Sequence, residues 1–174
     1  MHPEKLKVLL EDMERKLKNT TDLKSTGTVK AETFLLSEQT SVSKVRSFTV
    51  VSDEPESSGG KDLGPTPLEY FLASIGFCEN VTFVRNAALM NVRIDELMTR
   101  VVGHWNRKGQ FEIENKTPHF TDITVELSIS TTEQPEKVRE VARATFRRCP
   151  MHATISRATT VHTRLLVNGK EIEI

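Results

Sequence analysis

The chain has 174 residues, enough for one domain with a sizeable hydrophobic core. Its 24 Lys and Arg residues balance 24 Asp and Glu residues, so bulk charge draws it neither to nucleic acid nor to an anionic membrane. No apolar run approaches the ~20 residues of a membrane-spanning helix, and the mixed-charge N-terminus fits neither a secretory signal nor a transit peptide. We therefore expect a soluble cytoplasmic protein. In that reducing compartment, a persistent disulfide between its two cysteines would be unusual.

The N-terminal segment predicts one amphipathic helix followed by a linker. Over residues 3–18, a leucine-rich stripe recurs at helical spacing between charged residues. Such a stripe must lie on the rest of the domain or on a partner subunit. Residues 19–27 are interpreted as a linker. We therefore divide the chain into an N-terminal helix and linker, residues 1–27, and a domain, residues 28–174.

Two strands are predicted next, over about 28–36 and 40–51, with a hairpin loop between them. In the second strand, period-two alternation places Arg46 on the same face as Val42 and Phe48. A cation on an apolar strand face is a candidate partner for a buried anion. A polar loop rich in Gly, Pro and Ser follows.

The stretch "TPLEYFLASIGFC" predicts the start of a buried helix. Thr66 suits the N-cap, Pro67 suits the first helical position, and Glu69 suits the capping box. Only three residues between 68 and 84 are strongly polar. A helix that is apolar almost all round belongs at the centre of a fold, which places Cys78 in the core.

The rest of the chain predicts two strands, at about 92–107 and over "ITVELSIS", then a helix over about 135–148. A short helix follows Pro150, and the chain ends in a hairpin with an Asn-Gly turn. The order β-β-α-β-β-α-β-β, after one extra helix, predicts an α+β domain with two long central helices packed against antiparallel sheets. Because the first strands lie far from the later ones in sequence, an intertwined homodimer is a reasonable hypothesis.

The surroundings of the two cysteines differ. Cys78 has apolar and small neighbours on its helix, and burial raises the pKa of a thiol unless a cation lowers it. Arg46 is the best geometric candidate for that cation. Cys149 precedes Pro150 and would cap the short helix, where backbone N–H groups favour a thiolate. On the pattern alone, two passive core thiols are the simpler interpretation, since free cysteine is among the most buried residue types.

Two motifs resemble the OsmC/Ohr family of thiol-dependent hydroperoxide reductases. They are "GGKDLGPTPLEYFLASIGFC", shortly after "DEP", and "CPMHATISR" much later. The likeness covers about residues 28–168 and implies an OsmC-like fold, an intertwined α/β homodimer with active sites at the subunit interface. By position, Cys78 matches the family's peroxidatic cysteine and Cys149 matches its resolving cysteine.

Two positions depart from the family pattern. The Ohr and OsmC peroxidases place a glutamate directly after the helix-starting proline, where this chain has Leu68. Glu69 comes one residue later, about 100° around the helix, and is better interpreted as the capping-box partner of Thr66. The arginine of the Ohr type has no counterpart in "LLSEQTSV". Arg46 is the candidate for the OsmC-type arginine.

The resemblance implies a cysteine-based peroxidase. A Cys78 thiolate stabilised by Arg46 would attack an organic hydroperoxide, and Cys149 would then close a Cys78–Cys149 disulfide. An external dithiol, of the lipoyl type, would reset the pair, with no metal or other cofactor. Apolar side chains near the thiols would favour organic peroxides over hydrogen peroxide. These are Phe71, Ile75 and Phe77.

Three alternatives stay open. An OsmC-fold dimer without peroxidase activity, binding a small apolar or thiol-reactive ligand, fits the departure at Leu68 and the unclear arginine. A metal site at Cys149 and His152 lacks the three or four ligands that zinc uses. The third is a structural protein that docks through its N-terminal helix, and no residue favours it.

Overall fold

The computed structural model describes residues 3–157, 161–167 and 170–172. The fold is α+β, as predicted. Its strands form a β1–β2–β3 sheet, a β4–β5 ribbon and a β6–β7 ribbon, all antiparallel. The elements in chain order are α1 (Pro3–Lys18), α2 (Asp22–Ser25), β1 (Glu32–Ser37), β2 (Thr40–Val45), β3 (Phe48–Ser52), η1 (Glu56–Ser58), α3 (Pro67–Leu89), β4 (Glu96–Trp105), α4 (Arg107–Gln110), η2 (Ile113–Asn115), β5 (Phe120–Ser130), α5 (Pro135–Arg148), α6 (Pro150–Ile155), β6 (Leu165–Val167) and β7 (Lys170–Ile172).

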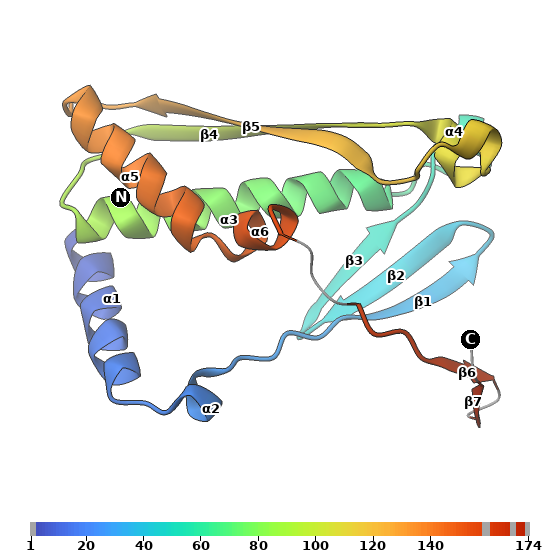
Figure 1. The fold of residues 1–174 in the computed structure, drawn as a ribbon, viewed down its shortest axis with the longest axis horizontal. Coiled ribbons are helices and arrows are strands. Elements are labelled where there is room, and N and C mark those ends of the chain that lie inside the picture. Colours follow the sequence, from blue (N-terminus) through green and yellow to red (C-terminus); the bar gives the residue numbers. More distant parts are fainter. Residues whose placement is uncertain (1–2, 158–160, 168–169, 173–174) are drawn as a thin grey trace.

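Helix α3 is the central element of the fold. It runs along the β4–β5 ribbon, and α5 and α6 pack beside it (Figure 1). The core between these elements contains Phe83 and Ala87 from α3 and Val141 from α5, all essentially inaccessible to solvent. This arrangement explains why α3 is apolar almost all round, because it is packed on more than one side.

The start of α3 is fixed by the capping box that the sequence predicted. The Thr66 side chain accepts a hydrogen bond from the Glu69 backbone N–H, and the Glu69 carboxylate accepts one from the Thr66 backbone N–H at 2.7 Å. Pro67 occupies the first turn. Glu69 is therefore committed to the helix end, and Tyr70 ties the first turn to β3 by donating its hydroxyl to the Val51 carbonyl oxygen at 2.7 Å.

The prediction of one strand over 40–51 was wrong. The chain reverses at Arg46 and Ser47, so that β2 and β3 pair with each other and Val45 faces Phe48. Arg46 has a φ of 58°, in the left-handed region that a two-residue hairpin turn demands. It lies at the exposed turn and not on a strand face, with its guanidinium 5.2 Å from the centre of the Phe48 ring.

The turn also changes which side chains share a face of the sheet. Val42 lies opposite Val51, whereas Val50 lies opposite Ser43. Val42 and Phe48 are therefore on different faces, contrary to the alternation predicted through residue 46. No glycine or asparagine marks this turn, which is why sequence periodicity ran across it.

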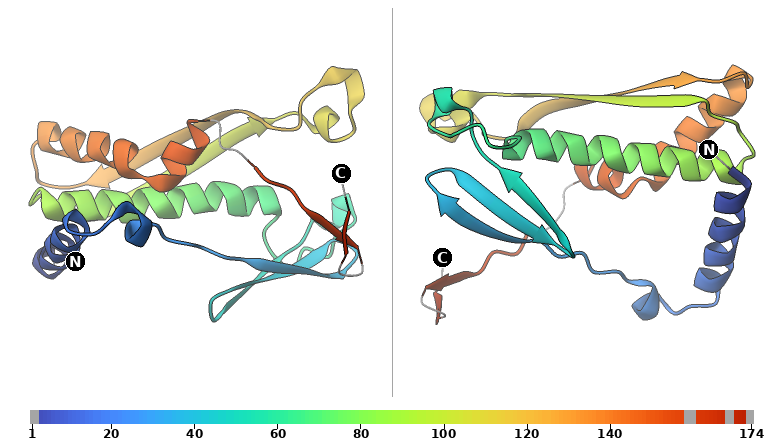
Figure 2. Two further views of the ribbon diagram at one scale, coloured as in Figure 1. Left: turned by 60° about the horizontal axis from the view of Figure 1, so that its bottom comes forward. Right: turned by 180° about the vertical axis from the view of Figure 1, so that it is seen from behind.

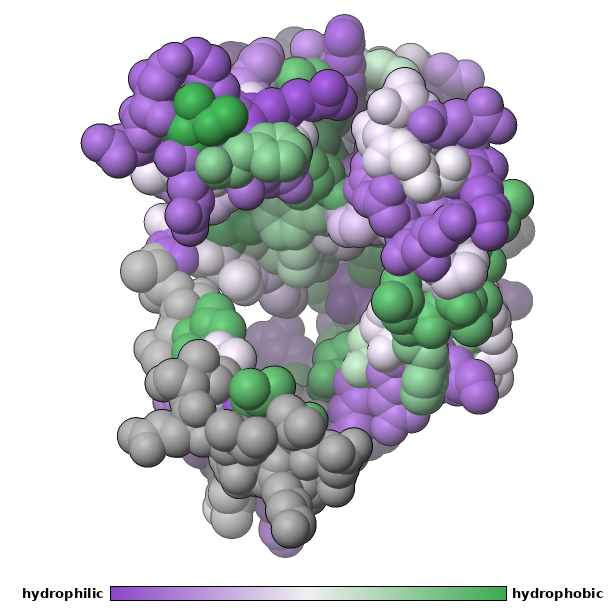
Figure 3. All heavy atoms as spheres, turned by 90° about the vertical axis from the view of Figure 1, so that its right-hand side faces the viewer, coloured by the Kyte–Doolittle hydropathy of each residue, from purple (hydrophilic) through white to green (hydrophobic). Residues whose placement is uncertain are grey.

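The β1–β2–β3 sheet projects from the helical part of the molecule, on the other side of α3 from the β4–β5 ribbon (Figure 2). Every residue of β1 is exposed. Large apolar side chains are among them: Phe34, Leu35 and Leu36. Apolar and polar side chains lie around a hollow at the end of the molecule that carries the β1–β2 hairpin (Figure 3).

The loop between β3 and α3 is held by Asp53. Its buried carboxylate accepts hydrogen bonds from the backbone N–H groups of Glu54, Lys61 and Leu63 and from the Thr40 hydroxyl. Burial raises the pKa of Asp53, but these donors outweigh it and leave the pKa below its ordinary value. These hydrogen bonds fix the path of the loop that leads into α3.

The two ends of the chain match their predictions in part. The predicted N-terminal helix is present as α1, which packs on the end of α3 and donates a hydrogen bond from Lys7 to Asn91 at 2.9 Å. The predicted linker contains the short helix α2. At the C-terminus β6 pairs with β7 as predicted, but the Asn-Gly turn lies outside the described residues. The domain boundary near residue 27 stays a prediction.

Candidate functional site

The two cysteines, 71 positions apart in sequence, meet in the structure. Cys78 lies in the middle of α3, and Cys149 lies between α5 and α6. Both thiols are free, and they lie close enough together for Cys78 to raise the pKa of Cys149. Cys149 is fully buried and Cys78 is half-buried, so Cys78 is the thiol that a reagent from solvent reaches first.

Cys149 owes its position to the junction of two helices. Its backbone N–H donates to the Thr145 carbonyl oxygen and ends α5, while its sulfur accepts from the His152 backbone N–H at 3.5 Å and begins α6. Pro150 forces this break, since proline cannot continue a helix. The predicted N-cap role of Cys149 is confirmed.

The expected thiolate character of Cys149 was wrong. The pKa of this thiol is raised to about 11, chiefly by burial and also by the neighbouring Cys78 thiol and the charge of Glu79. The His152 backbone N–H lowers it, but less. Helix α6 spans only six residues, and its N–H groups do not offset removal from water. Cys149 therefore keeps its proton at neutral pH.

Helices α3 and α5 are joined by buried polar contacts near the thiols. Asn86 donates to the Thr145 hydroxyl at 3.5 Å and accepts from the Arg148 guanidinium at 2.7 Å. Thr145 lies one turn before Cys149, on the same face of α5. These bonds hold the end of α5 against α3 and so help to keep Cys149 opposite Cys78.

A buried carboxylate that the sequence did not predict lies next to the thiols. Glu79 is fully buried, and its Oε1 atom lies 2.8 Å from Nδ1 of His152. Its Oε2 atom is buried and accepts no hydrogen bond from the described residues. The available signal was a charged residue in an otherwise apolar helix, but its partner 73 positions away could not be identified from spacing.

Arg46, the predicted cation, is not brought to Cys78 within the described chain. The contact that the structure gives it is with Phe48, at the exposed tip of the projecting sheet. Arg85, on α3 itself, is also exposed. A catalytic role for Arg46 therefore stays a prediction that depends on a second copy of the chain.

The three side chains expected to line the substrate site do not lie together. Ile75 is fully buried in the core, and Phe71 stacks on Phe120 with ring centres 5.6 Å apart. Phe77 is 68% exposed, beside Val81 on the outer face of α3. Of the three, Phe77 is the apolar side chain open to a ligand or a partner.

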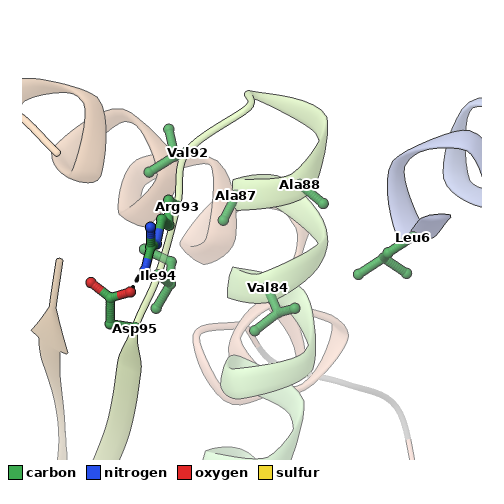
Figure 4. A pocket seen from close by; sticks show the side chains of 8 residues that line it. All are labelled: Leu6, Val84, Ala87, Ala88, Val92, Arg93, Ile94 and Asp95. Atoms are coloured by element: carbon green, nitrogen blue, oxygen red, sulfur yellow. Dashed lines mark hydrogen bonds and ion pairs between the residues drawn. The ribbon is translucent and has the colours of Figure 1, made fainter. Parts of the chain in front are cut away.

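A cleft of about 420 Å³ lies elsewhere, between α1 and the end of α3 (Figure 4). Leu6 and Val84 face each other across it, and Arg93 and Asp95 form an ion pair on the other side of α3's last turns. None of its lining residues is a nucleophile. The cleft is therefore separate from the thiol chemistry.

The described residues were compared with the requirements of a metal site and of a membrane-spanning helix. No three His, Cys, Asp or Glu side chains in the described residues are grouped as a metal site requires. None of the helices in that part of the chain combines the length and apolar character needed to cross a bilayer.

Comparison with protein families identifies the chain. The model of the OsmC-like protein family matches residues 59–164, which contain both cysteines and more than half of the chain. The chain belongs to this family. No curated protein matches it.

Solved structures of the family share the fold of this OsmC-like protein. The OsmC-like protein of Mycoplasma pneumoniae is 18% identical, with a TM-score of 0.66 over 75% of this chain and 88% of that one. An organic hydroperoxide resistance protein OsmC from Legionella pneumophila is 13% identical, with a TM-score of 0.58 over 75% and 90%. An organic hydroperoxide resistance protein from Elizabethkingia anophelis is 16% identical, with a TM-score of 0.58 over 75% and 90%.

Proposed function

We propose that this OsmC-like protein is a thiol-dependent peroxidase that reduces organic hydroperoxides. The observation that carries the proposal is the proximity of a half-buried thiol, Cys78, to a fully buried one, Cys149, whose pKa it raises. Membership of the OsmC-like family and structural relatives named as organic hydroperoxide resistance proteins support the same reaction. Two free thiols also suit a reducing compartment such as the cytoplasm.

The reaction needs one peroxide and one external dithiol in each cycle. The Cys78 thiolate attacks the O–O bond, the alcohol leaves with a proton, and Cys78 becomes a sulfenic acid. The Cys149 sulfur then displaces the sulfenic hydroxyl, which leaves as water, and a Cys78–Cys149 disulfide forms. A dithiol donor, of which a lipoyl-type compound is our candidate, reduces the disulfide by exchange and is itself oxidised.

An intertwined homodimer would supply the cation that a single chain does not place at Cys78. The β1–β2–β3 sheet projects with exposed apolar side chains, and Phe77 and Val81 expose a second apolar surface on α3. Association of two subunits is favoured when it removes such apolar surfaces from water. In this proposal Arg46, at the tip of the projecting sheet, serves the Cys78 of the partner subunit. Equilibrium sedimentation at micromolar concentration should then give twice the chain mass.

Steady-state turnover of cumene hydroperoxide tests the activity. Wild-type protein should turn over with dihydrolipoamide as the donor, and Cys78→Ser should be inactive with any donor. Cys149→Ser should lose turnover with dihydrolipoamide, since the intrachain disulfide cannot form, but keep one rapid peroxide reduction for each chain. Absence of peroxide consumption by the reduced wild-type dimer would reject the proposal and favour an OsmC-fold ligand-binding protein.

A further inference from the structure

We propose that Glu79 and His152 form the proton carrier for closure of the Cys78–Cys149 disulfide. This inference rests on the proposed peroxidase function and concerns its second step. It assigns a role to a buried carboxylate and to a histidine 73 positions away, neither of which takes part in the attack on peroxide.

The geometry of the pair is that of a carboxylate–histidine couple with one free position. Oε1 of the fully buried Glu79 lies 2.8 Å from Nδ1 of His152, so the two groups share a proton. Oε2 has no hydrogen-bond partner among the described residues. Burying a carboxylate oxygen without a hydrogen-bond donor costs folding free energy. The lone pairs of Oε2 are not engaged by a donor among the described residues and are therefore available to accept a proton.

The pair connects the surroundings of Cys149 to the surface at His152. Glu79 follows Cys78 directly on α3, and its charge acts on the Cys149 thiol. The backbone N–H of His152 donates to the Cys149 sulfur at 3.5 Å. The His152 side chain is 30% exposed, and its ring packs on Phe146 with centres 5.1 Å apart. A proton taken up at Glu79 can therefore exchange with water through the imidazole.

Glu79 interacts with two groups from the α5–α6 junction. His152 forms the hydrogen bond with the Oε1 atom of Glu79, and the charge of Glu79 acts on the thiol of Cys149. Arg148, the last residue of α5, is directed to Asn86 instead.

Disulfide closure is the step that needs such a carrier. Cys149 keeps its proton at neutral pH, and the thiolate is the nucleophile in sulfur exchange. In the closure step Glu79 takes the Cys149 proton, the S–S bond forms as the Cys78 S–O bond breaks, and the proton joins the departing hydroxide to give water. Both sulfurs end in the disulfide, and the pair returns to its starting protonation.

The test follows closure separately from peroxide attack. Reduced protein is mixed with one equivalent of cumene hydroperoxide, acid-quenched at set times, and analysed by mass for sulfenic acid and disulfide. Glu79→Gln keeps the size of the side chain, and its amide oxygen can still accept from Nδ1–H. We expect sulfenic acid to form at the wild-type rate and closure at pH 7 to slow by roughly 100-fold. The closure rate should then rise about tenfold for each pH unit as hydroxide replaces the carrier.

Two further variants separate proton transfer from packing. Asp122→Asn is the matched control, since Asp122 lies 2.8 Å from Nδ1 of His104 in an exposed pair on the β4–β5 ribbon. It should close its disulfide at the wild-type rate. His152→Asn keeps an amide donor for Glu79 but no imidazole, and its closure should slow by about tenfold. The closure rate of His152→Asn tests the inference even if Glu79→Gln does not fold.

The outcomes distinguish this inference from the proposed function. Wild-type protein that forms no sulfenic acid removes the peroxidase itself. Wild-type protein that forms a disulfide, together with Glu79→Gln or a folded His152→Asn that closes within about threefold of the wild-type rate at pH 7, overturns the carrier alone.

Discussion

The thiols of Cys78 and Cys149 are both free and lie close enough for Cys78 to raise the pKa of Cys149. One thiol is half-buried in the central helix, and the other is fully buried at a helix junction. Because Cys78 is accessible from solvent and Cys149 is not, the proposed reaction assigns peroxide attack to Cys78 and closure of the disulfide to Cys149.

Replacing Cys149 should trap the oxidised form of Cys78. With Cys149→Ser, one equivalent of hydroperoxide should add one oxygen, about 16 Da, and excess peroxide should add a second and a third, because no thiol resolves the sulfenic acid. Intact-mass spectra would follow the series. Cys78→Ser, treated in the same way, should gain no oxygen, and oxygen addition to that variant would contradict the assignment of Cys78 as the attacking sulfur.

Replacing Arg46 should slow peroxide attack without affecting stability. Arg46→Ala removes a cation that would favour the Cys78 thiolate, and the second-order rate at pH 7 should fall by about tenfold or more. Stopped-flow mixing with cumene hydroperoxide measures this rate. Lys44→Ala, which removes another exposed cation of the same hairpin, serves as the control and should stay near wild type.

A mixed dimer locates the arginine. Combining Arg46→Ala chains with Cys78→Ser chains leaves one dimer site with an intact Cys78 and an Arg46 from the other chain. We expect fast peroxide reduction to return in about half of the sites of such mixed dimers. No recovery would show that Arg46 does not act across the interface.

The raised pKa of Cys149 predicts a loss of stability at high pH. The folded state keeps this proton up to about pH 11, whereas the unfolded chain loses it near the ordinary thiol value of 9.0. Between these values the folded chain binds more protons, so the unfolding free energy of the reduced protein falls as pH rises. The fall from this group is roughly 2–3 kcal/mol.

Urea unfolding of the reduced protein at pH 8, 9, 10 and 11 measures this effect. Cys149→Ser should lack the component due to Cys149, so its stability should approach that of wild type as pH rises. Parallel pH dependences of the two proteins would contradict the assignment.

The hydrogen bonds to Asp53 predict that the stability of the fold depends strongly on the loop between β3 and α3. Asp53→Ala leaves several backbone N–H groups without their acceptor, and we expect the thermal midpoint to fall by about 5 °C or more. Gly60→Ala should act similarly, because a Cβ there would lie 1.8 Å from the Glu54 carbonyl oxygen. Glu56→Ala, in the same loop but exposed, should change little in differential scanning calorimetry.

Local sequence patterns predicted those parts of the fold that depend on local interactions. The start of α3 could be predicted because Thr66, Pro67 and Glu69 satisfy one another within a single turn. The break at Pro150 likewise placed Cys149 at an N-cap. By contrast, Arg46 was misplaced because a two-residue turn without glycine leaves no local mark, and one residue of slip changes the face of every side chain beyond it.

The electrostatics of the site depended on tertiary packing and could not be predicted. The N-cap of Cys149 was correctly located, but its effect on the thiol is smaller than that of complete burial, which only the packed helices reveal. The bond between Glu79 and His152 joins two helices across 73 positions and has no sequence pattern. These groups come together only when the chain is folded and the helices are packed.

The most direct measurement is the intact mass of the reduced protein after one equivalent of cumene hydroperoxide. We predict a loss of two hydrogens, about 2 Da. Neither thiol should then react with an alkylating reagent, and the peptide map should show Cys78 joined to Cys149. An unchanged mass with two reactive thiols after excess peroxide would contradict the proposal that these cysteines form a redox pair.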